Sequence, residues 1–584
     1  MNRSNFYTSE ISVQIVISLL KVNRIRHVIA SPGTTNVTFV ASVQQDSFFK
    51  VYSSVDERSA AYLACGIAAE TGEPVVLSCT GATASRNYMP GLTEAYYRKL
   101  PVIAITSNQG INKIGRLIPQ NIDRRSLPND IAIKSVYVPV ANTQKEIKAC
   151  ELLLNDVLSE ISRRGGGPIH INLTTNYSRD YSVTSLPEFR VIKRILSTNT
   201  TPVLNNSKIA IFIGSHKPFN KEEETAIDKF CSKYDAVAFC DHTSSYKGKY
   251  RVLYSLVACQ EKFDDNLNVD TLIHIGEISG DYYTSGVRPK EVWRVNPDGE
   301  MRDTFGRLKY VFEMEEIEFF NHYSKDSKVE RFEYYNICQH KLEEIKNNIP
   351  ELPFSNVWIA QHTAHLIPQN SVLHLGILNT LRSWNLFEVD KTVRTNCNVG
   401  GFGIDGILST LVGASLSNPS KLYFGVLGDL AFFYDMNVLG NHSVGNNVRI
   451  MLINNGRGTE FRNYDHPGNA FGDNADAYIA AAGHFGNKST QLIRHYAEDL
   501  GYKYLTANDK SSYLENLNKF LSPQIEHQSI IFEVFTDSQD ESDALKIIRS
   551  IKKEKKITPD KIRAQIRHIL GDQIVDAAKK IIKP

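Results

Sequence analysis

The sequence lacks the defining features of several protein classes. In its 584 residues, no apolar run approaches the 18 or more that a membrane-spanning helix needs. None of its eight cysteines is spaced Cys-x-x-Cys, so neither a zinc knuckle nor a redox motif is present. Neither sign of charge is in excess, since 66 Lys and Arg stand against 64 Asp and Glu, which argues against a dedicated nucleic-acid binder. The start is polar and does not resemble a signal peptide. We therefore expect a cytoplasmic protein with reduced cysteines.

Short apolar segments alternating with helical patterns are what the sequence does contain. Such alternation predicts parallel sheets covered by helices on both faces. We expect an α/β fold of three doubly wound parallel-sheet domains plus a basic, helical C-terminal appendix. The expected limits are a first domain over 1–180, a central domain over 200–330, a third domain over 350–540, and the appendix over 541–584.

Two segments between and after these domains have a composition of their own. Residues 177–206 are polar and irregular, which predicts a linker. Residues 541–584 carry twice as many Lys and Arg as Asp and Glu, and predict two amphipathic helices broken at Thr558-Pro559. A solvated appendix is favoured there over a lipid or anionic-partner contact.

The strongest chemical signal follows two apolar segments of the third stretch. Gly428-Asp429-Leu430 comes after the predicted strand 422–427, and Asn454-Asn455-Gly456 comes after the predicted strand 448–453. Each motif alone is typical of a turn. Together they place a carboxylate and an amide at the carboxyl ends of parallel strands, where open α/β sheets bind ligands. Such oxygens suit Mg²⁺, and a helix beginning near Ala431 would direct N–H groups at a diphosphate.

This pair of motifs resembles the diphosphate–magnesium motif of the thiamine-diphosphate enzymes. The first stretch supports the resemblance, because 55–58 (Val-Asp-Glu-Arg) resembles the glutamate-bearing helix start of that family. Residues 78–84 and 91–95 match its glycine-rich turn and the helix that follows. The resemblance covers roughly 10–540, and it implies that the first domain is the pyrimidine-binding domain and the third the diphosphate-binding domain.

Within that family, the sequence is most similar to the menaquinone-pathway synthases that make 2-succinyl-5-enolpyruvyl-6-hydroxy-3-cyclohexene-1-carboxylate, and more distantly to acetolactate synthase. The segments that carry this likeness are 31–35, 56–58, 403–410 and 428–437.

The resemblance implies two catalytic residues. Glu57 would be a buried carboxyl that hydrogen-bonds the aminopyrimidine of the cofactor, and burial would raise the pKa that this role needs. The alternative is a helix-start glutamate that interacts with the helix dipole. Gln120 matches an active-site glutamine near the substrate, with an ordinary surface glutamine as its alternative.

The resemblance also implies the groups that bind the cofactors, thiamine diphosphate and Mg²⁺. Ile404 matches the bulky apolar residue between the two cofactor rings, although an isoleucine is more often ordinary core. The carbonyl of Phe402 would accept from the 4′-amino group. The cofactor-binding set is Glu57, Phe402, Ile404, Gly428, Asp429, Leu430 and Asn455, and the metal ligands are Asp429, Asn455 and the carbonyl of Arg457.

The substrate-recognition residues depart from the menaquinone-pathway pattern. Those synthases grip carboxylate-rich substrates with arginines, but the matching positions here are Thr35, Gln109 and Val399, and only Arg382 is kept. The candidate substrate residues are Thr34, Thr35, Arg382 and Arg462, the last of which would meet an anionic or sugar-like acceptor.

The function implied is decarboxylation of a 2-oxo acid and transfer of the acyl anion equivalent to a carbonyl or enone acceptor. Alternatives are release of an aldehyde, the menaquinone-pathway reaction itself, and a catalytically silent homologue. A Rossmann-type dehydrogenase is disfavoured, because 31–35 does not supply a Gly-x-Gly-x-x-Gly turn. The family implies a homodimer or homotetramer with interface active sites, acting on small molecules, with no nucleic acid and no membrane span.

Overall fold

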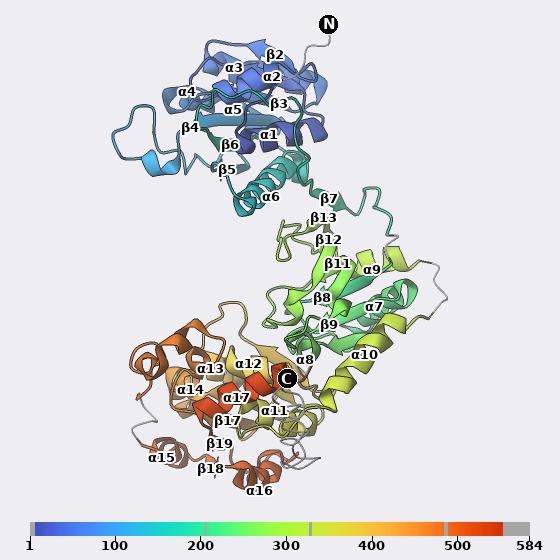
Figure 1. The fold of residues 1–584 in the computed structure, drawn as a ribbon, viewed down its shortest axis with the longest axis vertical. Coiled ribbons are helices and arrows are strands. Elements are labelled where there is room, and N and C mark those ends of the chain that lie inside the picture. The colour runs from blue at the N-terminus through green and yellow to red at the C-terminus, as the bar shows by residue number, and fades with distance from the viewer. Residues whose placement is uncertain (1–5, 205–206, 326–329, 484–488, 553–584) are drawn as a thin grey trace, which may run out of the picture. The chain divides into compact units, whose positions relative to one another are not determined.

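Three parallel-sheet domains follow one another along the chain (Figure 1). The computed structural model describes residues 6–204, 207–325, 330–483 and 489–552. The α/β class expected from the sequence is confirmed, with three sheets whose strands alternate with helices along the chain. Most of the basic appendix, including Thr558-Pro559, lies outside the described residues.

The first sheet has the order β2-β1-β3-β4-β6-β5, and every pairing in it is parallel. Neighbouring residues of its strands point to opposite faces, as in β1, where Val28 packs beneath one group of helices and Ile29 beneath the other. Its strands are β1 (His27–Ala30), β2 (Lys50–Ser53), β3 (Val75–Cys79), β4 (Val102–Asn108), β5 (Lys134–Val138) and β6 (Ile169–Thr174). One face is covered by α1 (Ile11–Val22), α2 (Val37–Gln44) and α6 (Gln144–Glu160), the other by α3 (Glu57–Thr71), α4 (Ala82–Asn87) and α5 (Met89–Arg98).

The second sheet has the order β10-β9-β8-β11-β12-β13-β7. The first of its strands, β7, lies inside the segment that the sequence predicts to be a linker, and that prediction is wrong for 193–196. The strand pairs in parallel with β13 along the sheet edge, where only Ile195 is buried, so no apolar run marks it. The elements are β7 (Lys193–Leu196), β8 (Ile209–Ile213), β9 (Val237–Cys240), β10 (Arg251–Leu253), β11 (Asn268–Ile275), β12 (Arg288–Val295), β13 (Leu308–Glu313), α7 (Lys221–Tyr234), α8 (Ser255–Ala258), α9 (Glu316–Ser324) and α10 (Glu333–Lys346).

The third sheet has the order β15-β14-β16-β17-β19-β18 and is again parallel throughout. Its strands are β14 (Val372–Leu375), β15 (Arg394–Cys397), β16 (Tyr423–Gly428), β17 (Val448–Asn454), β18 (Lys503–Ala507) and β19 (Ile530–Phe535). Its helices are α11 (Asn356–Thr363), α12 (Asn379–Trp384), α13 (Ile407–Leu416), α14 (Asp429–Asp435), α15 (Leu492–Asp499), α16 (Lys510–Phe520) and α17 (Ser538–Arg549).

Helix α17 crosses the limit at 540 that the sequence predicts between the third domain and the appendix. Its residues Glu541, Ala544, Leu545 and Ile548 are buried, so the beginning of the expected solvated appendix is instead a packed helix of the third domain. The amphipathic spacing of these residues is what packs it there.

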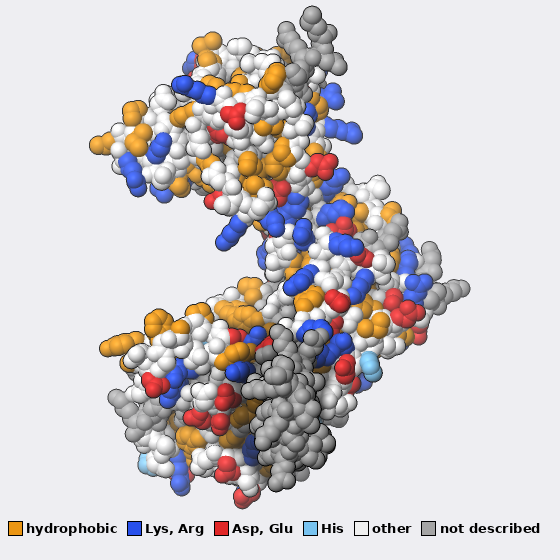
Figure 2. All heavy atoms as spheres, viewed as in Figure 1, with side chains coloured by type: hydrophobic (Ala, Val, Ile, Leu, Met, Phe, Trp, Pro, Cys, Tyr) orange, Lys and Arg blue, Asp and Glu red, His pale blue; other side chains and the backbone are white. Residues whose placement is uncertain are grey.

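Charged side chains of both signs are interspersed over the face shown in Figure 2, in keeping with the small net charge. None of the eight cysteines forms a disulfide bond. Among the described residues, no helix combines the length and the apolar character that crossing a membrane requires.

Candidate active site

Three neighbouring strands of the third sheet end beside one pocket. Because β14, β16 and β17 are adjacent and parallel, the residues that follow them meet at the same sheet edge. Asp429 follows β16 directly, as the first residue of α14, and Asn455 follows β17 directly. Of the predicted cofactor and metal residues, the pocket is lined by Ile404, Gly428, Asp429, Leu430, Asn455 and Arg457.

The oxygens of this pocket are those that a hard divalent cation needs. Asp429 is buried, and burial raises the pKa of its carboxyl to about 7, although the N–H groups of Leu430 and Gly456 hydrogen-bond to it. The side-chain oxygen of Asn455 is buried and has no hydrogen-bond partner. A bound cation would stabilise the charged form of Asp429 and take up the free oxygen of Asn455. The residues present therefore fit Mg²⁺.

This ligand set contains a single carboxylate. Among the described residues, no three His, Cys, Asp or Glu side chains gather as a metal cluster would require. The fit therefore depends on amide and carbonyl oxygens beside Asp429.

Sequence reasoning missed the pocket residues that follow β14 and the one that begins α11. The side-chain oxygens of Asn356 and Asn379 are buried without partners, and Thr380 lies beside them. The hydroxyl of Thr459, which also lines the pocket, is likewise buried without a partner. Asn379 comes four residues after a fully buried strand, which is the same signal that identified Asp429. These amide and hydroxyl groups suit the polar end of a diphosphate-bearing cofactor.

Ile404 and Phe402 lie on the segment that precedes α13. Ile404 is half-buried and packs against the core of the third domain while also lining the pocket, so it combines both of its predicted roles. Phe402 has a φ of +57°, which is uncommon for a residue with a side chain. Its ring packs edge-on against Tyr282, with the ring centroids 5.9 Å apart.

The arginines near this pocket are already paired with carboxylates of the chain. Arg382 donates to Glu460 through both terminal nitrogens. Arg457 donates to Asp476 at 2.7 Å, and Arg462 pairs with Asp473 at 3.0 Å. A substrate anion would therefore have to compete with these carboxylates for each guanidinium group.

Glu57 is the first residue of α3, and Asp56 caps the helix by accepting from the N–H of Arg58. The Glu57 carboxylate accepts from Nδ2 of Asn87 at 3.3 Å. Within the single chain Glu57 is only half-buried, so the burial expected of its carboxyl stays a prediction for the assembly. The reason is its position at the exposed start of the helix, since burial in α3 begins at Ala60.

Helix α3 is held in place by an unusually close approach to α5. A Cβ atom on Gly91 would lie only 2.5 Å from the Cβ of Ala61. Gly91 therefore lets the two helices come closer than any other residue would allow.

Thr34, Thr35 and Gln120 differ in exposure. Thr35 is buried, and its hydroxyl bonds to that of Thr80 at 2.6 Å and donates to the carbonyl of Ser107 at 3.0 Å, so it ties the ends of three strands together. Thr34 is exposed. Gln120 is exposed, with a φ of +64°, on the segment between β4 and β5.

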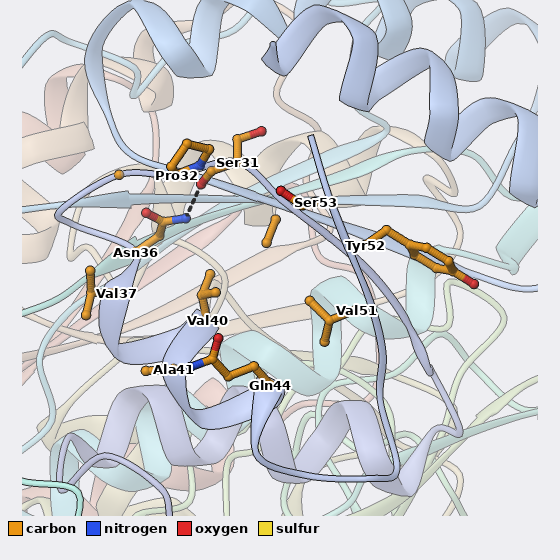
Figure 3. A pocket seen from close by; sticks show the side chains of 12 residues that line it. Ser31, Pro32, Asn36, Val37, Val40, Ala41, Gln44, Val51, Tyr52 and Ser53 are labelled. Carbon is orange, nitrogen blue, oxygen red and sulfur yellow. Dashed lines mark hydrogen bonds between the residues drawn. The ribbon is translucent and has the colours of Figure 1, made fainter. Parts of the chain in front are cut away.

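A separate groove of about 620 Å³ lies under the Ser31-Pro32-Gly33 turn of the first domain. Figure 3 shows Val37, Val40 and Gln44 of α2 on one side of it, and the side chains of β2 on the other. Nδ2 of Asn36 donates to the carbonyl of Ser31 at 3.0 Å and shapes the turn. The groove does not include Glu57.

Comparison with known proteins agrees with this architecture. Residues 12–127 match the family described as thiamine pyrophosphate enzyme, N-terminal TPP binding domain. Together with a relative that is 30% identical over 92% of the chain, this match shows that the chain belongs to the thiamine pyrophosphate enzymes and is a thiamine-diphosphate-dependent enzyme.

The relatives have one name in common. A 2-succinyl-5-enolpyruvyl-6-hydroxy-3-cyclohexene-1-carboxylate synthase of Bacteroides fragilis is 30% identical over 565 residues, which cover 92% of this chain and 98% of the relative. A synthase of the same name from Bacteroides thetaiotaomicron is 30% identical over 562 residues, with the same shares covered. One from Flavobacterium johnsoniae is 28% identical, with 90% of this chain and 95% of the relative covered.

Proposed function

We propose that this protein decarboxylates a 2-oxo acid and transfers the resulting acyl anion equivalent to a carbonyl or enone acceptor, with formation of a C–C bond. The observation that carries the proposal is the pocket at the ends of β14, β16 and β17. It gathers a buried carboxylate with partnerless amide oxygens in a chain of this family. Bound thiamine diphosphate supplies the electron sink that makes loss of CO₂ possible.

The residues of the chain would divide this work as follows. Asp429, Asn455 and the carbonyl of Arg457 would hold Mg²⁺, and the cation would neutralise the diphosphate. Ile404 would fix the bend of the cofactor from the pocket wall, and the carbonyl of Phe402 would accept from its 4′-amino group. Glu57 would hold a proton at the aminopyrimidine nitrogen, and Gln120 would position the substrate.

We also propose that the protein works as a homodimer or homotetramer in the cytoplasm. The support is the family resemblance, in which the glutamate of one copy serves the diphosphate site of another. Half-burial of Glu57 within the single chain is consistent with completion by a second copy.

The test starts from purified protein stripped of cofactor. It is titrated with thiamine diphosphate and Mg²⁺, after which pyruvate and 2-oxoglutarate are added separately and CO₂ release is measured. Binding followed by CO₂ release from one acid supports the proposal and names the donor. Failure to bind thiamine diphosphate in the presence of Mg²⁺ contradicts it.

The activity in the name of the relatives is the second candidate, favoured by 30% identity over 92% of the chain. Against this activity stand Thr35, Gln109 and Val399, at positions where the resemblance leads us to expect arginine. Formation of the named product, followed by mass spectrometry, decides between the two acceptor chemistries.

A further inference from the structure

Arg124 is a buried cation in the first domain, on the segment between β4 and β5. Only 4% of its surface is exposed. Nη2 donates to the side-chain oxygen of Asn172 at 2.8 Å, whereas Nε and Nη1 are buried with no hydrogen-bond partner. An arginine stays charged at any ordinary pH, so this burial places an unsatisfied positive charge in the protein interior.

Nothing nearby in the described chain balances that charge. Among the described residues no carboxylate pairs with Arg124, and its one acceptor is a neutral amide that also receives Nδ2 of Asn108 at 2.8 Å. Burial lowers the pKa of the arginine accordingly. The adjacent Arg125 has the opposite character, since it is exposed and pairs through Nε and Nη2 with Asp123, at 3.0 and 2.7 Å.

The guanidinium group lies at the ligand-binding edge of the first sheet. Asn172 belongs to β6, Asn108 ends β4 and Gly81 follows β3, and parallel strands bind ligands beyond these carboxyl ends. A Cβ atom on Gly81 would lie 3.5 Å from Nη2 of Arg124 and 3.2 Å from the carbonyl of Gln120. Arg124 is thus next to the segment that carries a predicted catalytic residue.

The segment that leads to Arg124 along the chain is held mainly by local backbone turns. Between Gly110 and Asn121 the backbone hydrogen bonds of the segment span only three residues each, and Leu117 and Gln120 have positive φ angles. Segments whose backbone hydrogen bonds are local open at low free-energy cost. Movement of this segment would give a ligand a route to Nε and Nη1 of Arg124.

From these observations we infer that Arg124 binds the carboxylate of the 2-oxo acid substrate. The inference rests on the proposed function for the identity of the acid. A carboxylate supplies the missing negative charge and the missing acceptors together, and guanidinium–carboxylate pairing is strong in a dry site. Arg124 would therefore be a binding residue that supplies a guanidinium group. The resemblance implies several such groups, and this chain keeps few of them.

The experiment uses the holoenzyme with thiamine diphosphate and Mg²⁺, and compares Arg124→Gln with the matched control Arg125→Gln. Cofactor binding is measured first by calorimetry and tests the proposed function on its own. Thermal stabilisation by pyruvate and by 2-oxoglutarate is then titrated in each protein. We expect the Kd of the stabilising acid to rise at least about tenfold in R124Q and to stay unchanged in R125Q.

A second measurement separates binding from folding. Removal of an unbalanced buried charge should leave the melting temperature of R124Q, without acid, equal to or above that of the wild type. Arg124→Lys should retain part of the acid affinity. The inference is overturned if R124Q binds the acid as the wild type does, if it only loses stability, or if a wild type that binds cofactor binds neither acid.

Discussion

Glu460 receives both terminal nitrogens of Arg382, Nη1 at 2.8 Å and Nη2 at 2.7 Å. Both side chains are largely buried, with 13% of Arg382 and 17% of Glu460 exposed. Although burial opposes its charged form, the Glu460 carboxylate holds the pKa of Arg382 above its usual value. The candidate substrate arginine is therefore already neutralised by the chain itself.

Glu460→Gln should release Arg382 for substrates. We expect KM for an acidic substrate to fall several-fold, because the carboxylate that competes for the guanidinium is gone. The free energy of unfolding should drop by about 2 kcal/mol, since a largely buried charge loses its partner. Steady-state kinetics and urea denaturation measure the two effects. Glu498→Gln, which breaks an exposed pair with Arg494, should change stability by less than about 0.5 kcal/mol.

Asp429→Asn should abolish the metal-dependent part of cofactor binding. We expect Kd for thiamine diphosphate with Mg²⁺ to rise by about 100-fold or more, because an amide cannot replace the charge of a metal-binding carboxylate. Without cofactor the variant should be at least as stable as the wild type, since burial already disfavours the charged carboxyl. Calorimetric titration is the measurement, and exposed Asp499→Asn is the control. Unchanged affinity would remove Asp429 from the metal site.

Glu541 should make the stability of the third domain depend on pH. It is fully buried, accepts from the backbone N–H of Asn356 at 3.0 Å, and burial raises its pKa from 4.5 to about 7. The folded state binds this proton more tightly than the unfolded state does. Its stabilisation is therefore complete below pH 4.5 and is lost as the pH rises through 7.

The size of this effect is on the order of 3 kcal/mol. Glu541→Gln cannot ionise, so its melting temperature should fall less between pH 5 and pH 8 than that of the wild type. Calorimetry at matched ionic strength compares the two slopes. Equal slopes would mean that Glu541 is not the titrating group.

Glu57→Gln should separate cofactor binding from turnover. The amide preserves the shape of the side chain but cannot hold and return a proton, so we expect cofactor affinity within a few-fold of the wild type. Turnover should fall by about 10²–10⁴-fold. Single-turnover kinetics at saturating cofactor are the measurement. Glu94→Gln, in an exposed pair with Arg98 on α5, should leave turnover unchanged. Retained turnover in E57Q would return Glu57 to a helix-start role.

The sequence predicts buried strands well and edge strands poorly. The predicted strand 448–453 falls within β17, and the predicted strand 422–427 overlaps β16, because strands covered on both faces are apolar throughout. Strands β2, β5 and β7 escape prediction. All three lie at a sheet edge. Most residues of β2 and β7 are not buried, and β5 buries only two of its five residues.

The residues of the candidate site also differ in how well the sequence predicts them. Asp429 and Asn455 are predictable because each follows a buried strand, and parallel pairing brings their strand ends together. The partner of Arg382 is not predictable, since Glu460 lies 78 residues away and no local pattern links them. The burial of Arg124 is not predictable either, because nothing in the sequence distinguishes it from its neighbour Arg125, which is exposed.

The contact between Gly91 and Ala61 has a consequence for how this protein can evolve or be engineered. Any side chain at position 91 would push α3 away from α5, and Glu57 at the start of α3 would move with the helix. A screen of random substitutions for activity would therefore find Gly91 as intolerant of change as a catalytic residue. Glycine nevertheless has no side-chain group that could take part in the reaction. If catalytic residues were identified from mutational intolerance alone, positions such as Gly91, which only allow two helices to approach, would be counted among them by mistake.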